Sequence, residues 1–156
     1  MESVSQYKYI IDTSAILSQK GDEQYRRSVF RTLWKTIDEM ITNKELVICS
    51  EIAAEIQDDD IKTWLKEKDI CVLPIDDEIQ ANVREVVTSV NKDLVDFKEN
   101  KSSGDVFLIA TAMKYGLAVI TEEKKNSPKK IPYTCQQLNI DCMNMLEFME
   151  KKGISL

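Results

Sequence analysis

The most informative absence in this sequence is histidine, because none of the 156 residues is one. Without histidine the chain has no Ser-His-Asp or Cys-His catalytic group and no imidazole that transfers protons near neutral pH. It also lacks the ligand on which most catalytic zinc sites depend. Catalysis by this chain must therefore use carboxylates, hydroxyls, lysines or a metal ion.

Glycine, proline and long apolar segments are also scarce. The 4 glycines and 3 prolines are too few for a disordered chain, and 43% hydrophobic with 31% charged residues is typical of a globular protein. No apolar run approaches the ~20 residues that a membrane span needs. Residues 1–8 lack the basic start and apolar middle of a signal peptide. We expect a single domain in the cytoplasm, with no membrane contact.

The four cysteines show no C-x-x-C spacing. Cys49 and Cys71 lie in apolar runs and are expected to be buried, reduced thiols. With no histidine and no close cysteine pair, a zinc site is not expected.

The formal net charge of −6 argues against a strongly basic nucleic-acid-binding surface. An acidic metal site would contribute to that negative count, however, and bound divalent ions would partly neutralise it. The basic residues are grouped locally, and one group is Lys124, Lys125, Lys129 and Lys130. The charge balance weakens a nucleic-acid function without excluding it.

Apolar runs and helical repeats alternate along the chain. A run over 7–11 predicts a strand that ends at Asp12, and Tyr25, Val29, Leu33, Ile37 and Ile41 predict one helix. Further strands are expected at 46–49, 70–73 and 117–120, and further helices after Ser50 as a cap, at 61–65, 79–90 and 104–113, near Gln136 and before Gly153. This alternation predicts one parallel sheet covered by helices on both faces, with right-handed crossovers.

Four acidic residues, Asp12, Glu55, Asp105 and Glu123, occur at the ends of apolar runs. In a parallel α/β sheet, ligands bind beyond the carboxyl ends of the strands. Carboxylates brought there by separate segments repel one another and shift each other's pKa, so a cation stabilises such a cluster. Hard oxygen ligands suit Mg²⁺ or Mn²⁺.

Each acid also has a simpler explanation. Asp12 is favoured as a helix N-cap, although Thr13 or Ser14 could cap that helix equally well. Asp105 is a favourable charge at a helix N-terminus, and Glu55 with Glu51 fits a solvated helix face. The order and context of all four acids together are more specific than any one of them.

That combination resembles the PIN-domain nucleases, a family that contains many ribonuclease toxins of bacterial toxin–antitoxin pairs. The resemblance rests on Ile10-Ile11-Asp12-Thr13-Ser14, on residues 50–56, on Asp105 with Leu108-Ile109-Ala110 and Ala112, and on Val119-Ile120-Thr121-Glu122-Glu123. It covers nearly the whole chain. It implies a three-layer α/β/α PIN-like fold with a central parallel sheet, in a single domain over residues 1–156.

The resemblance also implies a site. By its spacing, the catalytic and metal-binding residues would be Asp12, Glu55, Asp105 and Glu123, supported by the hydroxyls of Ser14 and Thr121. The last acid is more often aspartate in that family, so Glu123 departs from its pattern. Whether Glu122 or Glu123 is the fourth acid stays open.

The resulting hypothesis is a Mg²⁺- or Mn²⁺-dependent endoribonuclease that hydrolyses RNA phosphodiester bonds, the toxin of a toxin–antitoxin pair. Lys124 and Lys125 would contact the RNA, and the expected protein partners are a cognate antitoxin and a second copy in a homodimer. The alternative is an inactive PIN fold that acts as a protein- or RNA-binding module. A phosphatase of the haloacid dehalogenase type is disfavoured, because its second aspartate would stand where Ser14 is.

Overall fold

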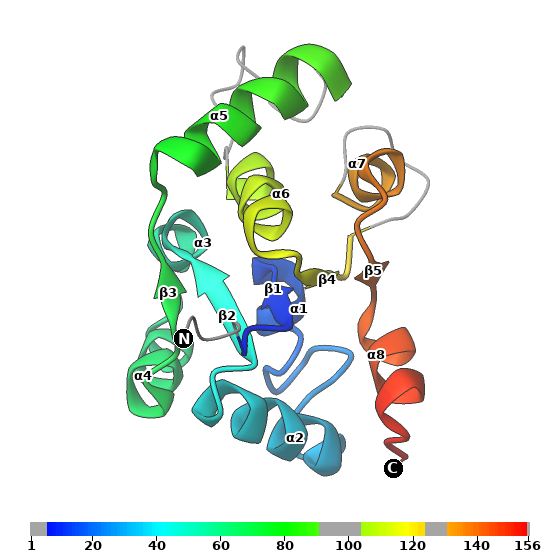
Figure 1. Ribbon diagram of the computed structural model, residues 1–156. Helices are drawn as coiled ribbons and strands as arrows, with labels where there is room; N and C mark the ends of the chain where they lie inside the picture. Colours follow the sequence, from blue (N-terminus) through cyan, green and yellow to red (C-terminus); the bar gives the residue numbers. More distant parts are fainter. Residues whose placement is uncertain (1–5, 91–103, 124–130, 156) are drawn as a thin grey trace.

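A parallel sheet forms the centre of the fold (Figure 1). The computed structural model describes residues 6–90, 104–123 and 131–155. Within these ranges the sheet has five strands in the order β3-β2-β1-β4-β5. They are β1 (Tyr9–Ile11), β2 (Leu46–Cys49), β3 (Val72–Leu73), β4 (Ala118–Ile120) and β5 (Cys142–Met143). The polar segment 93–103 and the basic loop with Lys124 and Lys125 lie outside the described residues.

The strand order reverses between β1 and β4. The chain runs outward from β1 to β2 and β3, then returns to β4 on the other side of β1. Ile11 of β1 pairs with Ile120 of β4, and the Asp12 amide donates to the Ile120 carbonyl oxygen over 2.9 Å. The residues that follow these two strands are therefore neighbours. Such a reversal is the switch point at which open α/β sheets bind ligands.

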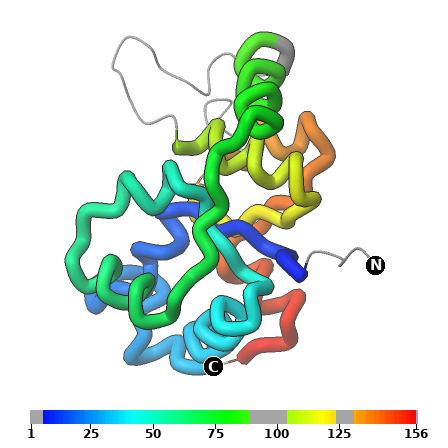
Figure 2. The backbone as a smooth tube through the Cα atoms, turned by 60° about the vertical axis from the view of Figure 1, so that its left-hand side comes forward, coloured from blue at the N-terminus to red at the C-terminus, as the bar shows by residue number. Residues whose placement is uncertain are grey.

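Helices cover both faces of the sheet (Figures 1 and 2). One layer contains α3 (Ser50–Glu55), α5 (Asp77–Glu85), α6 (Gly104–Tyr115) and α7 (Ile131–Leu138). The opposite layer contains α2 (Arg31–Thr42), α4 (Asp59–Lys68) and α8 (Met145–Lys152). The short helix α1 (Thr13–Leu17) follows β1 directly, and a π-helical turn (Val86–Val90) extends α5. The expected three-layer α/β/α architecture is confirmed.

The central strands are apolar because both of their faces are covered. Every residue of β1 and β2 is buried, and their sequences, YII and LVIC, contain no charged residue. A strand of an antiparallel sheet with one wet face would alternate polar and apolar residues instead. The continuous apolar runs thus encode the burial of the sheet.

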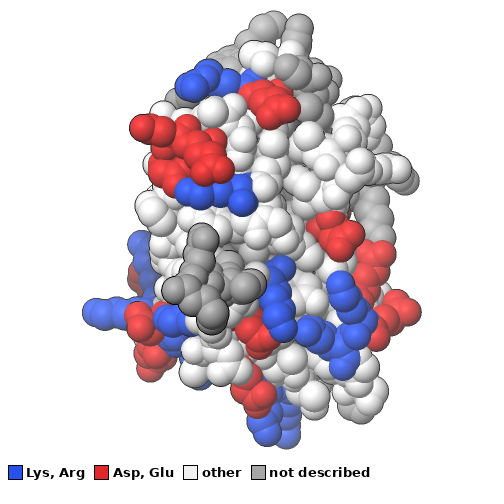
Figure 3. Space-filling view, viewed as in Figure 1, with Lys and Arg blue, Asp and Glu red and all other residues white. Residues whose placement is uncertain are grey.

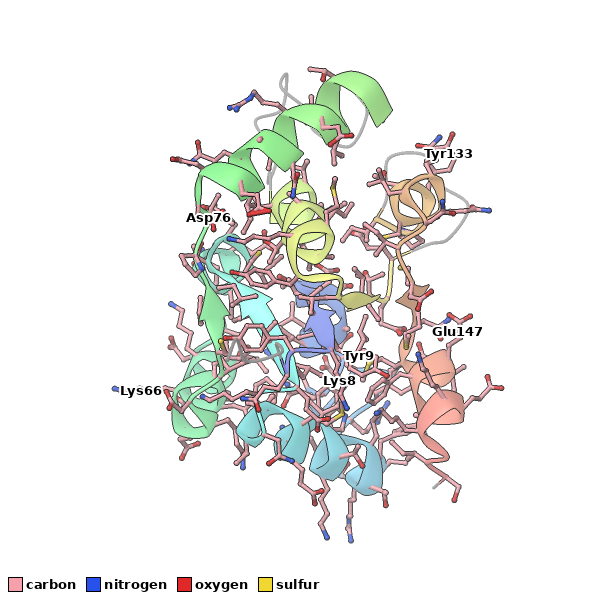
Figure 4. The ribbon with its side chains drawn as sticks, viewed as in Figure 1. Lys8, Tyr9, Lys66, Asp76, Tyr133 and Glu147 are labelled. Carbon is pink, nitrogen blue, oxygen red and sulfur yellow. The ribbon has the colours of Figure 1, made fainter. Side chains whose placement is uncertain are left out.

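Short polar side chains define where several helices begin. Asp58 caps α4 and Asp76 caps α5, each accepting a hydrogen bond from a backbone amide three residues later. Asn144 and Glu147 form a reciprocal capping box at α8. Figure 4 labels Asp76 and Glu147 at the starts of α5 and α8. Gly153, with φ of 67°, ends α8 as expected.

The helix predicted from Tyr25 to Ile41 is only half correct. It begins at Arg31, and Val29 is 53% exposed instead of buried. The preceding segment is shaped by tertiary contacts, because the Tyr25 carbonyl accepts from Nε1 of Trp34 over 2.6 Å. The bond to Trp34 takes the place of the backbone hydrogen bond that the Tyr25 carbonyl would accept within a helix.

Two local predictions also differ from the structure. Ser50 does not cap α3; it is the first residue of that helix, which has no side-chain cap. The strand expected at 70–73 is reduced to β3, an edge strand in which Val72 is 42% exposed. No helix in the described ranges combines the length and apolar composition of a membrane span.

Candidate metal centre

Asp12 lies at the switch point, where β1 ends. It has the extended backbone of an N-cap residue of α1, yet its side chain does not cap that helix. Instead Oδ2 accepts hydrogen bonds from Oγ of Ser14 (2.6 Å) and Oγ1 of Thr121 (2.9 Å). Burial raises the pKa of Asp12 to about 6, the nearby Glu123 charge adds to the rise, and the two hydroxyls oppose it. The Asp12 side chain is therefore oriented by two hydroxyl groups and does not serve as a helix cap.

Ser14 and Thr121 connect the first strand to the segment after β4. Their hydroxyl oxygens lie 3.2 Å apart. Oγ of Ser14 accepts from the Glu122 amide (3.0 Å), and Oγ1 of Thr121 accepts from the Glu123 amide (3.2 Å). The two hydroxyls therefore fix both the Asp12 carboxylate and the backbone that carries the fourth acid.

Glu55 reaches the same region from the last turn of α3. Its Oε1 accepts a hydrogen bond from Oγ1 of Thr13, the residue after Asp12. This contact joins the carboxyl ends of α3 and β1. The sequence suggested Thr13 only as a helix cap, and its role as a partner of Glu55 carried no signal in the sequence.

Asp105 is held in the first turn of α6, a helix whose following residues are largely buried. Its carboxyl group lies close to that of Glu123. Burial, followed by the charges of Glu123 and Asp12, raises the pKa of Asp105 well above its ordinary value, and Glu55 contributes less. Asp105 thus interacts electrostatically with each of the other three acids named from the sequence, although the four come from separate segments.

The contacts of Glu122 and Glu123 distinguish the two. Oε2 of Glu122 accepts from the Met145 amide over 2.7 Å, in the first turn of α8. Oε1 of Glu123 accepts from the Ile131 amide over 2.9 Å at the start of α7, and Glu123 also contacts Asp105. Glu123 therefore joins Asp12, Glu55 and Asp105 in one acidic group of four carboxylates. Glu122 instead stabilises a helix end.

The donor set fits a hard divalent cation. In the described part of the chain, no three carboxylates or thiols already surround one point closely enough to enclose an ion. The oxygen donors themselves, carboxylates backed by hydroxyls, are those that Mg²⁺ and Mn²⁺ prefer. Carboxyl groups that lie this close repel one another when ionised, and a divalent cation would offset that repulsion with positive charge.

Comparisons with known proteins place the chain in a family and identify its fold. Residues 9–156 match a family described as "Domain of unknown function (DUF4411)". No curated protein matches the chain.

Three solved structures share its architecture at low sequence identity. FitAcB from Neisseria gonorrhoeae is 15% identical with a TM-score of 0.54, over 88% of this chain and 98% of that one. FitAB bound to the IR36 DNA fragment is 13% identical with a TM-score of 0.54, over 88% and 94%. PAE2754 from Pyrobaculum aerophilum is 15% identical with a TM-score of 0.50, over 94% and 89%. The chain has a PIN-like fold.

Proposed function

The chain belongs to the DUF4411 family, and from its site we propose that it is a metal-dependent endoribonuclease that hydrolyses RNA phosphodiester bonds. The observation that carries this proposal is the electrostatic group formed by Asp12, Glu55, Asp105 and Glu123 at the switch point of a parallel sheet. In the absence of histidine, an oxygen-ligated metal is the hydrolytic catalyst that these residues best support.

Asp12, Asp105 and Glu123 would hold Mg²⁺ or Mn²⁺, with Glu55 as a further ligand. When bound at these carboxylates, such an ion would lower the pKa of a water molecule and would offset charge on the phosphate. Ser14 and Thr121 orient the Asp12 carboxylate, and Thr13 orients Glu55. The Ile131 amide fixes one oxygen of Glu123. No protein nucleophile is required.

The choice of RNA rests on the sequence resemblance to PIN-domain ribonucleases. On the face seen in Figure 3, basic and acidic side chains of the described residues form small neighbouring groups, without one broad basic surface. RNA affinity would then depend strongly on the metal-bound phosphate. Lys124 and Lys125, outside the described residues, would add phosphate contacts.

We also propose that the chain is the toxin of a toxin–antitoxin pair. This rests on the same resemblance, and it implies a protein partner that covers the acidic group. Co-purification of a small protein encoded beside this one would support the proposal. A homodimer follows from the resemblance as well, and sedimentation equilibrium would test it.

The decisive assay measures cleavage of single-stranded RNA with Mg²⁺ or Mn²⁺, by the wild type and by an Asp12→Asn, Asp105→Asn double variant. The double variant should lose cleavage. Glu122→Gln is the matched control, because Glu122 is adjacent in sequence but contacts α8. Equal activity of the wild type and the double variant would refute the assignment, and a DNA substrate in parallel would establish whether DNA is cut.

The second candidate is a binding module that has lost catalysis. The observation that favours it is Glu123, whose longer side chain replaces the usual aspartate, lies beside Asp105 and already accepts a hydrogen bond from the Ile131 amide. Calorimetry with Mn²⁺ separates the two functions. A chain that binds no divalent ion cannot perform the proposed hydrolysis.

A further inference from the structure

A cavity of ≈ 600 Å³ adjoins the acidic group. Thr13 and Glu55, whose side chains are hydrogen-bonded to each other, form the wall shared with that group. The other walls are Leu17, Lys20 and residues 22–23 on one side, and residues 56–58 on the other. Its volume lies within the range of about 300–1,000 Å³ that is usual for small-molecule sites.

The walls of the cavity are held in place. Nζ of Lys20 forms an ion pair with Oδ2 of Asp58, which links the segment after α1 to the start of α4. The other oxygen of Asp58 accepts from the Ile61 amide over 3.0 Å. Next to Lys20, Nε2 of Gln19 donates to the Ile16 carbonyl over 2.9 Å. The cavity is therefore bounded by anchored side chains on both sides.

Contacts farther along the same segment hold Gln19 itself. Nε of Arg27 donates to Oε1 of Gln19 over 2.6 Å. The Arg27 guanidinium carbon lies 5.2 Å from the ring centroids of both Trp34 and Trp64. The segment that carries Lys20 is thus tied to α2 and α4, which preorganises the cavity wall.

The chemistry of the lining favours a flat group with N–H donors. Leu17 and Ile56 are apolar, and Gln57 has an amide. Among the described residues of the lining, four carry carboxylates and Lys20 is the single cation, which is already paired with Asp58. This excess of acceptors disfavours a phosphate inside the cavity. It favours a planar group whose faces pack against the apolar side chains and whose edge donates hydrogen bonds to the carboxylates.

We propose that this cavity, the base pocket, binds the base of a nucleotide adjacent to the scissile phosphate in single-stranded RNA. The proposal rests on the proposed nuclease function, because a phosphate at the acidic group would place the neighbouring nucleotide against the wall of Thr13 and Glu55. Single-stranded RNA offers unstacked bases whose edges are free to be read.

The base pocket should prefer adenine and cytosine over uracil. Adenine and cytosine carry an exocyclic amino group, which donates to a carboxylate. Uracil has no exocyclic amino group and presents one N3–H donor between two carbonyl oxygens, so it offers Asp22 and Glu23 in the lining fewer donors and more repulsive acceptors. Asp58 contributes less, because Lys20 and the Ile61 amide already occupy both of its oxygens.

The test compares kcat/KM for oligo-A, oligo-C and oligo-U with Mn²⁺. The wild type should cleave oligo-A and oligo-C about tenfold better than oligo-U, a ratio that corresponds to about 1.4 kcal/mol, because each base donates an additional hydrogen bond to a charged group. An Asp22→Asn, Glu23→Gln double variant should bring the ratio close to one. The matched control is Asp59→Asn with Asp60→Asn, which removes the same charge from exposed residues of α4 outside the cavity.

Leu17→Trp provides a second variant, because a larger side chain at this wall would fill the base pocket. It should weaken binding of oligo-A, measured by fluorescence anisotropy, while calorimetry shows Mn²⁺ binding unchanged. Absence of any RNA cleavage by the wild type would overturn the proposed function. Cleavage without base preference, or a preference that survives the Asp22, Glu23 variant, would overturn the base pocket alone.

Discussion

The carboxyl group of Asp105, in the first turn of α6, lies beside the carboxyl group of Glu123, which follows β4. Two ionised carboxylates this close to each other repel. Burial and the neighbouring charges of Glu123 and Asp12 therefore raise the pKa of Asp105. The carboxylates of the acidic group repel one another, and binding of a proton or a metal ion reduces this repulsion.

The first prediction concerns the pH dependence of the metal-free protein. The pKa of Asp12 is about 6 in the folded protein, above the ordinary aspartate value of 3.8. Because the folded state binds this proton more tightly, the stability that Asp12 contributes is fully present below the unfolded pKa and is lost as pH rises through about 6.

The measurement is urea unfolding of wild type and Asp12→Asn in a chelator. Asp12→Asn should become more stable relative to wild type between pH 4 and pH 7, by a few kcal/mol at most, since one pKa unit corresponds to about 1.4 kcal/mol. Surface acids such as Asp76, paired with Lys114, are the same in both proteins and cancel in the comparison. A difference that does not change with pH would contradict the assigned environment of Asp12.

The second prediction concerns metal binding. Mn²⁺ should raise the unfolding temperature of the wild type, because a ligand at about 100 times its Kd adds roughly 2.7 kcal/mol to stability. The Asp12→Asn, Asp105→Asn variant should show little shift. Glu122→Gln should respond like the wild type, since Glu122 bonds to the Met145 amide. An equal Mn²⁺ response in all three proteins would place the metal elsewhere.

The third prediction concerns the hydroxyls beside Asp12. Thr121→Val removes a hydrogen bond that lowers the pKa of Asp12, so this pKa should rise further. Mn²⁺ affinity should fall about 10- to 100-fold, as for other groups that orient metal ligands. The acidic limb of the pH–rate profile should move to higher pH.

Thr121→Ser is the control for this change, because it keeps the hydroxyl that donates to Asp12. It should restore both the Mn²⁺ affinity and the position of the acidic limb. A Thr121→Val protein with an unchanged pH profile would show that this hydroxyl does not act on Asp12.

The parallel sheet could be predicted because strands that are buried on both faces have continuous apolar sequences. The apolar runs that end at Ile11 and Cys49 both became strands, and the helix opened by Gly104 and Asp105 lies where its apolar residues indicate. These features depend on local composition, and the sequence contains that information directly.

The features that could not be predicted depend on distant partners. Glu122 and Glu123 differ by one position, and their separate roles are decided by the Met145 and Ile131 amides. Val29 fits a helical repeat but lies exposed, because the Tyr25 carbonyl binds Trp34 instead of continuing a helix. Tertiary contacts determine both outcomes, and they override the local periodicity of the sequence.

The fourth prediction concerns Arg27, which supports the segment beside the base pocket. Its guanidinium donates two hydrogen bonds of 3.1 Å to Asp38 and lies over Trp34 and Trp64. Arg27→Lys removes the bidentate pairing with Asp38 and much of the contact with the two tryptophan rings. Because the Arg27 side chain is 37% exposed, solvent screening limits the expected loss of stability to about 1–2 kcal/mol.

Urea unfolding of Arg27→Lys and of Arg31→Lys gives the comparison. Arg31 is the matched control, since it is exposed and its Nε donates to the Ser28 carbonyl oxygen over 3.2 Å. Mn²⁺ binding should survive Arg27→Lys, because Arg27 contacts none of the four acids. Loss of Mn²⁺ binding without loss of stability would mean that the α1–α2 segment is coupled to the metal centre itself, and that the centre extends beyond the switch point.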